Sequence, residues 1–421
     1  MKKSIKNKPK EFLYYFNFAV FFLCGNVIFS QTITKRFEKE ISVSSEEKVE
    51  IKGPGSLPFE SRGSLTLNTE NGYALVPRDN NGVPAFIAQT LHIKASKDEK
   101  LRQVIDVNIV PHEKSPKDAE ALLKALELDI LRNGKSYRMN NNMNIERLSF
   151  SNGFLKGTKN WIRLTNGKKY NVRSIEISAS VQIPENLEVF IDAKYIDIMA
   201  KEFNGELHLK ADNSSIYIDQ LQSLKAELKT SKIEFSSIQK ASIFAYNTSI
   251  EGKSVDTLML GKANTRSEES LFSGHNTASV SRYTIDEIDF LNITTTTSDE
   301  FRFKTIGSLN IASSFFSNYS IQMLEESLTM NAKHGDIIIE EISNKIKEVD
   351  INNQLSKISL GVHNLQNYRV LFPKGVYTEK ELPPNLNTSL DNGTEIFTKG
   401  TSTNSKPITI RCNSCKVYIK D

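Results

Sequence analysis

The feature that most constrains this chain is a short pattern that recurs along its second half. The segments LEVFIDAKYIDIM, LHLKADNSSIYID, LTMNAKHGDIIIE and ITIRCNSCKVYIK start at Leu187, Leu207, Leu328 and Ile408 and align without a gap. Each has apolar residues at its first, third, tenth and twelfth positions and a polar corner between them. Such alternation is typical of strands with one buried face. Each copy therefore predicts two short strands joined by a turn.

Looser copies start near Ala226, Ala241, Leu258, Leu291 and Leu309, and another at Val349, at intervals of mostly about 15 to 21 residues. A unit of this size cannot bury its apolar side alone, whereas stacked units can. We therefore predict a mainly β chain, a parallel β-solenoid or β-helix of about 8–10 short coils. An antiparallel barrel or sandwich is the competing fold, but hairpin signals such as Asn-Gly are largely absent from residues 205–370.

Stacking predicts columns of like residues inside the coils. One column is Leu209, Leu228, Ile243, Leu260, Ile293, Ile311, Met330 and Ile351. The other is Ile218, Phe235, Phe303, Ile321, Ile339 and Leu360.

Residues 31–180 lack this repeat and include a helical pattern, and we predict that they form an N-terminal α+β cap for the solenoid. One amphipathic helix is expected at about residues 116–132, because Ser115 suits an N-cap, Pro116 the first turn and Gly134 the end. A hairpin is expected through Asn166 and Gly167. The solenoid would then occupy residues 181–372, a polar loop 373–407 and a terminal coil 408–421.

The first thirty residues predict a signal peptide over 1–30. Five lysines precede the apolar run FLYYFNFAVFFLCG, which is the order of a secretory signal. These residues carry five Lys and one Glu, a net charge equal to the +4 of the whole chain, so the processed chain is near neutral. This removes the charge argument for nucleic acid as a partner. We expect an exported protein of the periplasm, outer membrane or cell surface, with membrane contact only if this segment is retained.

The export signal, the helical SPKDAEALLKALELDI and the ladder that ends in ITIRCNSCKVYIK together resemble a bacterial envelope family labelled "putative adhesin". That family is similar to the head domains of some autotransporter adhesins. The resemblance covers most of residues 45–420 and implies a β-solenoid, with no catalytic residues. The family pattern favours Asn-Gly at the corner where this chain has Ser414 and Cys415.

Cys412 and Cys415 bracket the last corner. A thioredoxin-type site needs its first cysteine at a helix N-terminus, and a structural zinc site needs four ligands. Neither is indicated here, and exported proteins favour disulfides. We therefore predict a local disulfide between the two cysteines that keeps the terminal coil from fraying.

Outward positions of the coils are the candidate ligand-binding surface. Polar and aromatic side chains on a flat sheet face can hold a glycan or another envelope or surface protein. The residues proposed for this surface are Lys210, Tyr217, Lys229, Phe244, Asn331, Asn352 and Arg411.

No catalytic motif is evident, and the histidines are scattered without metal-ligand spacing. We expect neither a metal nor a small-molecule cofactor. The leading prediction is a non-enzymatic protein of binding or adhesion. The alternatives are a structural or signalling-accessory protein that acts through another envelope protein, and a carbohydrate-active enzyme on a β-helix.

Overall fold

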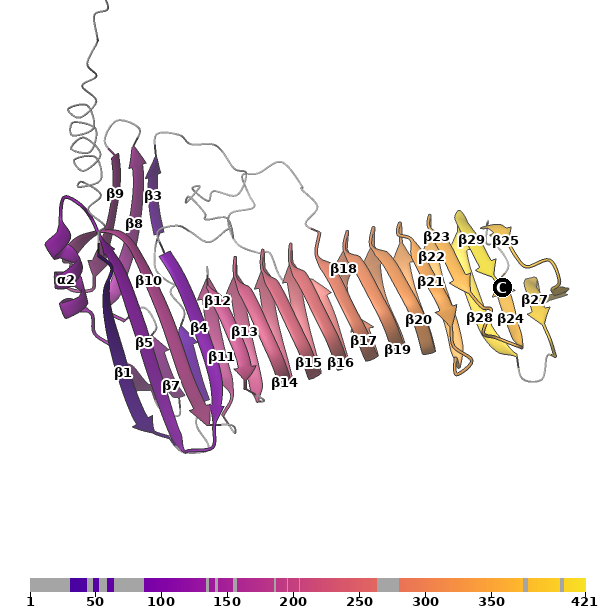
Figure 1. Cartoon of the computed structure of the whole chain (residues 1–421). Coiled ribbons are helices and arrows are strands. Elements are labelled where there is room, and N and C mark those ends of the chain that lie inside the picture. The colour runs from indigo at the N-terminus through magenta and orange to yellow at the C-terminus, as the bar shows by residue number, and fades with distance from the viewer. Residues whose placement is uncertain are drawn as a thin grey trace, which may run out of the picture.

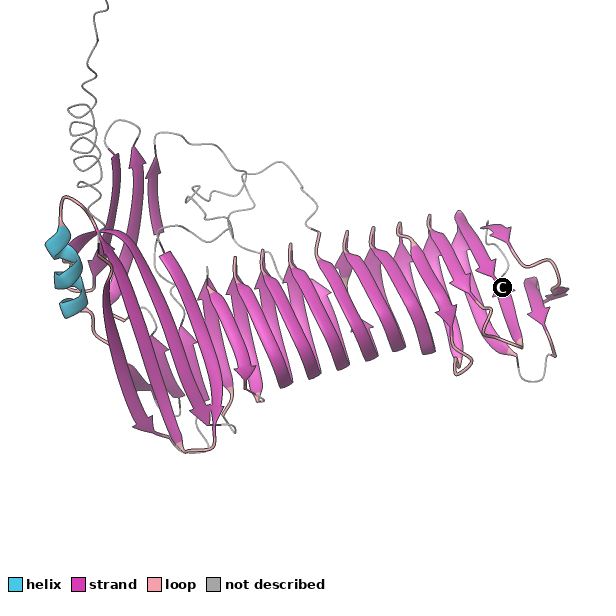
Figure 2. Cartoon of the chain, in the orientation of Figure 1, coloured by secondary structure: helices cyan, strands magenta, loops and turns pink. Residues whose placement is uncertain are grey.

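The computed structural model describes residues 31–43, 48–52, 59–63, 87–133, 136–140, 143–153, 157–184, 187–194, 196–203, 205–262, 280–373, 378–401 and 405–421. The predicted signal peptide, residues 1–30, lies outside them. Over the described ranges the chain is mainly β, with a single α-helix and a large mixed sheet (Figure 2). The strands follow one another from an N-terminal block to the C-terminus, so the molecule is elongated (Figure 1). None of the described helical residues forms a helix long and apolar enough to cross a bilayer.

The N-terminal block is a mixed arrangement of antiparallel and parallel strands, with the helix on its outer side (Figure 1). Strand β5 pairs with β1 on one edge and with β10 on the other. Strand β10 also pairs in parallel with β4, which pairs in parallel with β12, so the block continues directly into the following strands. The strands of the block are β1 (Ile33–Ser42), β2 (Lys48–Lys52), β3 (Phe59–Gly63), β4 (Ile87–Ser96), β5 (Lys100–Pro111), β6 (Ile130–Asn133), β7 (Ser136–Asn140), β8 (Ile145–Gly153), β9 (Gly157–Leu164) and β10 (Lys169–Pro184).

Helix α2 (Pro116–Ala125) is shorter than the predicted 116–132. It begins as expected, with Pro116 in its first turn, although the Ser115 side chain makes no capping hydrogen bond. It ends at Leu126, whose backbone is extended, and Ile130 instead pairs with Met139 in the β6–β7 hairpin. Ile130 fits the helical spacing of apolar residues, but its pairing with Met139 of β7 makes it part of a strand. The hairpin predicted at Asn166 and Gly167 is confirmed, because β9 and β10 pair across it and Gly167 has φ +82°.

After the block, the chain forms a ladder in which each long strand pairs in parallel and in register with the next (Figure 1). Its strands are β11 (Val189–Lys194), β12 (Asp197–Glu202), β13 (Glu206–Asp212), β14 (Ser215–Lys229), β15 (Lys232–Tyr246), β16 (Ser249–Lys262), β17 (Arg282–Ile293), β18 (Thr296–Thr297), β19 (Glu300–Phe315), β20 (Asn318–Lys333), β21 (Ile337–Ile342), β22 (Glu348–Gln354), β23 (Lys357–Gly361) and β24 (Tyr368–Phe372). The halves of β14 pair with different strands, β12 and β13, so one strand takes part in two separate parallel pairings. One repeat of this ladder is called a coil below.

The predicted apolar columns are confirmed, with one exception. The pairings link Leu209 to Ala226, then to Ile243, Leu260, Ile293, Ile311, Met330, Ile351 and Ile410, and all of these residues are buried. Leu228 belongs to a neighbouring column, opposite Ala211 and Ala245. The second column runs as predicted and gains Gly252, Ile285 and Ile419.

The first copy is also paired two residues away from the predicted alignment. Val189, rather than Leu187, stands opposite Leu207. A slip of two residues keeps every side chain on its own face, so alternation alone cannot distinguish the two registers.

The corners between successive coils share one backbone conformation. One residue in each has a left-handed conformation, with φ between +47° and +60°. These residues are Asn213, Thr230, Asn247, Ser298, Phe316, His334, Leu355 and Ser414. The next residue is usually small and polar, and its side chain accepts a hydrogen bond from the preceding coil. The N–H of Ser214 donates to Ser231 Oγ over 3.2 Å, and that hydroxyl donates to the Lys229 carbonyl over 2.7 Å.

The predicted polar loop 373–407 is wrong, because it contains three strands. These are β25 (Thr378–Glu381), β26 (Asn387–Asp391) and β27 (Thr394–Lys399). Strands β26 and β27 form a hairpin through Asn392 and Gly393, both with positive φ. Strand β27 pairs with β24, and β25 with β29 (Cys415–Lys420). The last coil, β28 (Lys406–Asn413) and β29, is thereby covered on its outer edge.

Candidate ligand-binding groove

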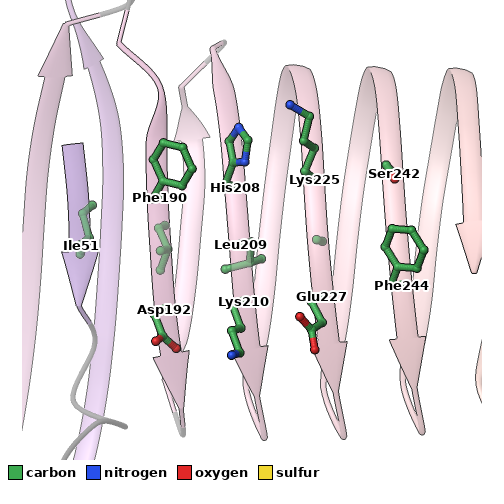
Figure 3. Close-up of a pocket in the computed structure, with 12 residues that line it drawn as sticks. Ile51, Phe190, Asp192, His208, Leu209, Lys210, Lys225, Glu227, Ser242 and Phe244 are labelled. Atoms are coloured by element: carbon green, nitrogen blue, oxygen red, sulfur yellow. The ribbon is translucent and has the colours of Figure 1, made fainter. Parts of the chain in front are cut away.

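An open groove lies on the side of the ladder near the N-terminal block, with a volume of about 470 Å³. Four parallel strands, β11, β13, β14 and β15, form its floor. Two rows of outward side chains cross these strands (Figure 3). The first row is Phe190, His208, Lys225 and Ser242, and the second is Asp192, Lys210, Glu227 and Phe244. Between the rows, Ile191, Leu209 and Ala226 turn inward and are buried.

Aromatic rings stand at the two ends of the groove (Figure 3). The rings of Phe190 and His208 are stacked, with their centroids 4.2 Å apart and their planes 28° apart. At the other end, the Phe244 ring lies over Gly261 of the next strand, and a Cβ atom at Gly261 would come within 2.8 Å of that ring. Gly261 therefore allows the ring to lie flat along the ladder, and Phe244 is still 38% exposed.

The first row is held by an ion-pair cluster. Glu206 Oε1 lies 2.8 Å from Lys225 Nζ and 3.1 Å from His208 Nε2. The hydrogen bond from Lys225 holds the pKa of Glu206 below its ordinary value, and the same bond raises the pKa of Lys225. Both groups therefore stay charged at neutral pH, and Glu206 fixes the orientation of His208 against Phe190.

The second row alternates in charge along neighbouring strands: Asp192, Lys210 and Glu227 stand opposite one another in register. Adjacent strands are about 4.8 Å apart. Among the described residues, no ion pair within 4.0 Å occupies these three groups. Their hydrogen-bonding capacity is therefore directed to solvent or to a ligand.

The predicted surface residues divide between different places. Lys210 and Phe244 both line the groove. Lys229, a residue predicted for the same surface, lies in another column. It pairs with Asp212 and Tyr246, and Glu227 occupies the position opposite Lys210. The repeat between these coils is a uniform 17 residues, so Lys210 aligns with Glu227 rather than Lys229.

The remaining predicted residues lie away from the groove. Asn331, Asn352 and Arg411 follow one another in register farther along the ladder, and Arg411 pairs with Asp350. Tyr217 lies between Met199 and Glu234, in the half of β14 that pairs with β12 rather than with β13.

The two cysteines lie at the last corner, remote from the groove. The structure joins Cys412 and Cys415 by a disulfide, with Cα atoms 5.7 Å apart, and both residues are buried. In the preceding coil the corresponding side chains, Asn353 and Ser356, are joined by a hydrogen bond of 2.9 Å. The disulfide thus takes the place of a polar contact within the corner.

Six groove residues were missed by sequence reasoning: Phe190, Asp192, His208, Lys225, Glu227 and Ser242. Alternation places each of them outward, which was the available signal. What was missing was the register that brings them together. Within the described part of the chain, no group of His, Cys, Asp and Glu side chains could hold a metal ion.

Comparison with known proteins adds little. No protein-family model matches the chain, and no curated protein matches it either. One similar solved structure is that of a putative cell adhesion protein from Clostridium sporogenes ATCC 15579. It is 10% identical over 92% of this chain and 99% of that one, with a TM-score of 0.15. A score this low supports no conclusion about fold or function, and the resemblance to the "putative adhesin" family stays a prediction.

Proposed function

We propose that the ladder is a β-solenoid and that the chain is an exported, non-enzymatic binding protein whose lateral groove holds a glycan. The observation that carries this proposal is the pair of outward rows across β11, β13, β14 and β15. They combine the exposed ring of Phe244 with three charged groups, Asp192, Lys210 and Glu227, for which the described part of the chain shows no ion pair within 4.0 Å. Every coil of a solenoid has outward side chains, so outward position alone does not mark a binding site. The groove is set apart because its outward side chains line a cavity.

A glycan suits the chemistry of the groove. A sugar hydroxyl both donates and accepts hydrogen bonds. Asp192 and Glu227 offer acceptors on either side of the Lys210 donor, in one row. The Phe244 ring offers an apolar surface for the C–H face of a sugar ring. The groove is open along the ladder, which suits a chain that continues beyond the bound residues.

The ion pair between Glu206 and Lys225, which holds the first row, is not suited to proton transfer. A general acid or base works best with a pKa near the operating pH. The contact between Glu206 and Lys225 moves both pKa values away from neutrality, downward for the carboxyl and upward for the ammonium. This pair is therefore suited to holding a shape rather than to transferring a proton.

Binding of the purified protein to a glycan array tests the proposal. We expect Phe244→Ala to weaken binding by roughly tenfold or more, as for a central aromatic contact. Asp192→Asn and Glu227→Gln, which keep the side-chain shapes, should weaken it as well.

Two variants serve as controls. Phe290→Ala removes an equally exposed ring on β17, outside the groove, and Tyr217→Ala removes the aromatic in the half of β14 that pairs with β12. Both should bind like the unmodified protein. Unchanged binding by Phe244→Ala would refute the groove as the site. Binding to no glycan, with Phe244-dependent retention of one envelope protein, would favour the accessory function instead.

A further inference from the structure

A second surface lies on the corners of the ladder near its C-terminal half. Three successive corners there present Phe316, His334 and Leu355 in their left-handed positions. Phe315 and Lys333 precede the first two of them and pair with each other in register. These five residues are called the corner ridge below. They are distinct from the groove, which is lined by β2, β11, β13, β14 and β15.

The ridge differs from the other left-handed corners, which carry the small polar residues Asn213, Thr230, Asn247, Ser298 and Ser414. A left-handed backbone is unfavourable for residues with a bulky side chain, and Asn is among the residues that tolerate it best. Asn213 and Asn247 occupy the same position in earlier coils. Phe316 and Leu355 adopt it with φ of +54° and expose 58% and 49% of their surface. Their side chains therefore gain little from the fold, which points to a role outside it.

Two rings of the ridge stack on each other. The Phe316 and His334 rings have their centroids 4.8 Å apart and their planes 11° apart. This separation is that of neighbouring strands, so the rings stack along the ladder axis. Phe316 nevertheless remains 58% exposed, so the stacked pair presents apolar surface that the fold does not cover.

The charge of the ridge suits contact with an anionic surface. Lys333 Nζ lies 6.0 Å from the centre of the Phe315 ring, and the five residues include no carboxylate. The acidic residues closest to the ridge in sequence are Asp336 and Asp350. Asp350 pairs with Arg411, and Asp336 accepts the N–H of Lys357. Apolar side chains next to a lysine are typical of segments that lie in the headgroup region of a membrane.

We propose that the corner ridge inserts into a lipid surface, with the apolar side chains of Phe316 and Leu355 entering the acyl boundary and Lys333 facing anionic headgroups. Size favours lipid over a protein partner. Three corners span only about 10 Å, whereas a stable protein interface buries about 800 Å² on each partner.

Fluorescence of a tryptophan placed in the ridge tests the insertion directly. Phe316→Trp is made in the full chain with Trp161→Phe, which removes the native tryptophan, and Phe290→Trp in the same background, at another exposed phenylalanine, is its matched control. The probe is vesicles of phosphatidylcholine with phosphatidylglycerol, some carrying brominated acyl chains. We expect the emission of Trp at position 316 to shift to shorter wavelength and to be quenched by bromine, and that of Trp at 290 to stay unchanged.

Loss of the side chain gives the second readout. Phe316→Asn places at this corner the residue that earlier coils use, so the protein should fold normally. We expect Phe316→Asn to reduce vesicle binding roughly tenfold, and Lys333→Gln to reduce it only on vesicles with phosphatidylglycerol. Equal signals from positions 316 and 290, or vesicle binding unaffected by Phe316→Asn, would overturn the proposal. A shift at position 316 with a protein but not with vesicles would overturn it in favour of a protein partner.

Discussion

At the scale of single residues, the corners decide how the ladder turns. A left-handed residue reverses the chain, and the side chain that follows it hydrogen-bonds the coil before. Asn and Ser serve these positions well because their short side chains can bond the local backbone. Leu355 and Phe316 have no such capacity, and their presence costs stability that Asn would not.

Leu355→Asn should therefore stabilise the protein by about 1 kcal/mol. The left-handed conformation costs most residues about 1–2 kcal/mol, Asn offsets part of this cost by bonding the local backbone, and Leu355 is half exposed, so little packing is lost. Thermal unfolding followed by circular dichroism measures the change. Asn247→Leu, the reverse exchange at an equivalent corner, should lower the midpoint. A fall in the midpoint of Leu355→Asn would show that the leucine packs usefully.

Ser231→Ala should destabilise the protein by about 1–3 kcal/mol, because the buried N–H of Ser214 loses its acceptor. Urea unfolding measures the difference. Ser215→Ala is the matched control, since Ser215 is exposed and its hydroxyl contributes no such bond. If the two variants unfold at the same urea concentration, the corner hydroxyls do not stabilise the stack.

At the scale of elements, sequence reasoning succeeded where one periodic pattern decides the outcome. The apolar columns were predictable because burial of one face requires strict alternation. The end of α2 was not, because Ile130 fits the helical stripe and its pairing with Met139 is a contact distant from the helix. Strand β26 was missed because all five of its residues are exposed, which leaves no alternation to detect. Predicting the groove also required the strand register. An alignment error of two residues was enough to select Lys229 instead of Glu227 as the neighbour of Lys210.

The disulfide of the last coil should be interchangeable with the polar contact of the coil before. Closing so short a loop contributes roughly 2 kcal/mol, so Cys412→Ala with Cys415→Ala should loosen the terminal coil. Cys412→Asn with Cys415→Ser, which copies Asn353 and Ser356, should restore most of the protection. Hydrogen exchange of β28 and β29 gives the measurement. Thiol titration provides the check, because reactive thiols at both positions without reductant would exclude the disulfide.

At the scale of the whole molecule, the chain is an elongated stack in which each coil contacts mainly its neighbours (Figure 1). The N-terminal block covers one end, and β24 to β27 cover the last coil at the other. Open strand edges invite association with other chains, so both covers protect the stack. The groove and the corner ridge lie at different points along it, which would allow a ligand and a lipid surface to be engaged together.

The central claim is that equivalent residues of successive coils lie on one line along this stack. Distances between spin labels measured by pulsed electron resonance test it most directly, with one label at Lys210 and the second at Asn331, Asn352 or Arg411. We expect about 29, 34 and 38 Å, since these positions are six, seven and eight pairings from Lys210 and each pairing adds about 4.8 Å. Distances that fail to increase in this order would contradict the parallel stack, and with it the groove.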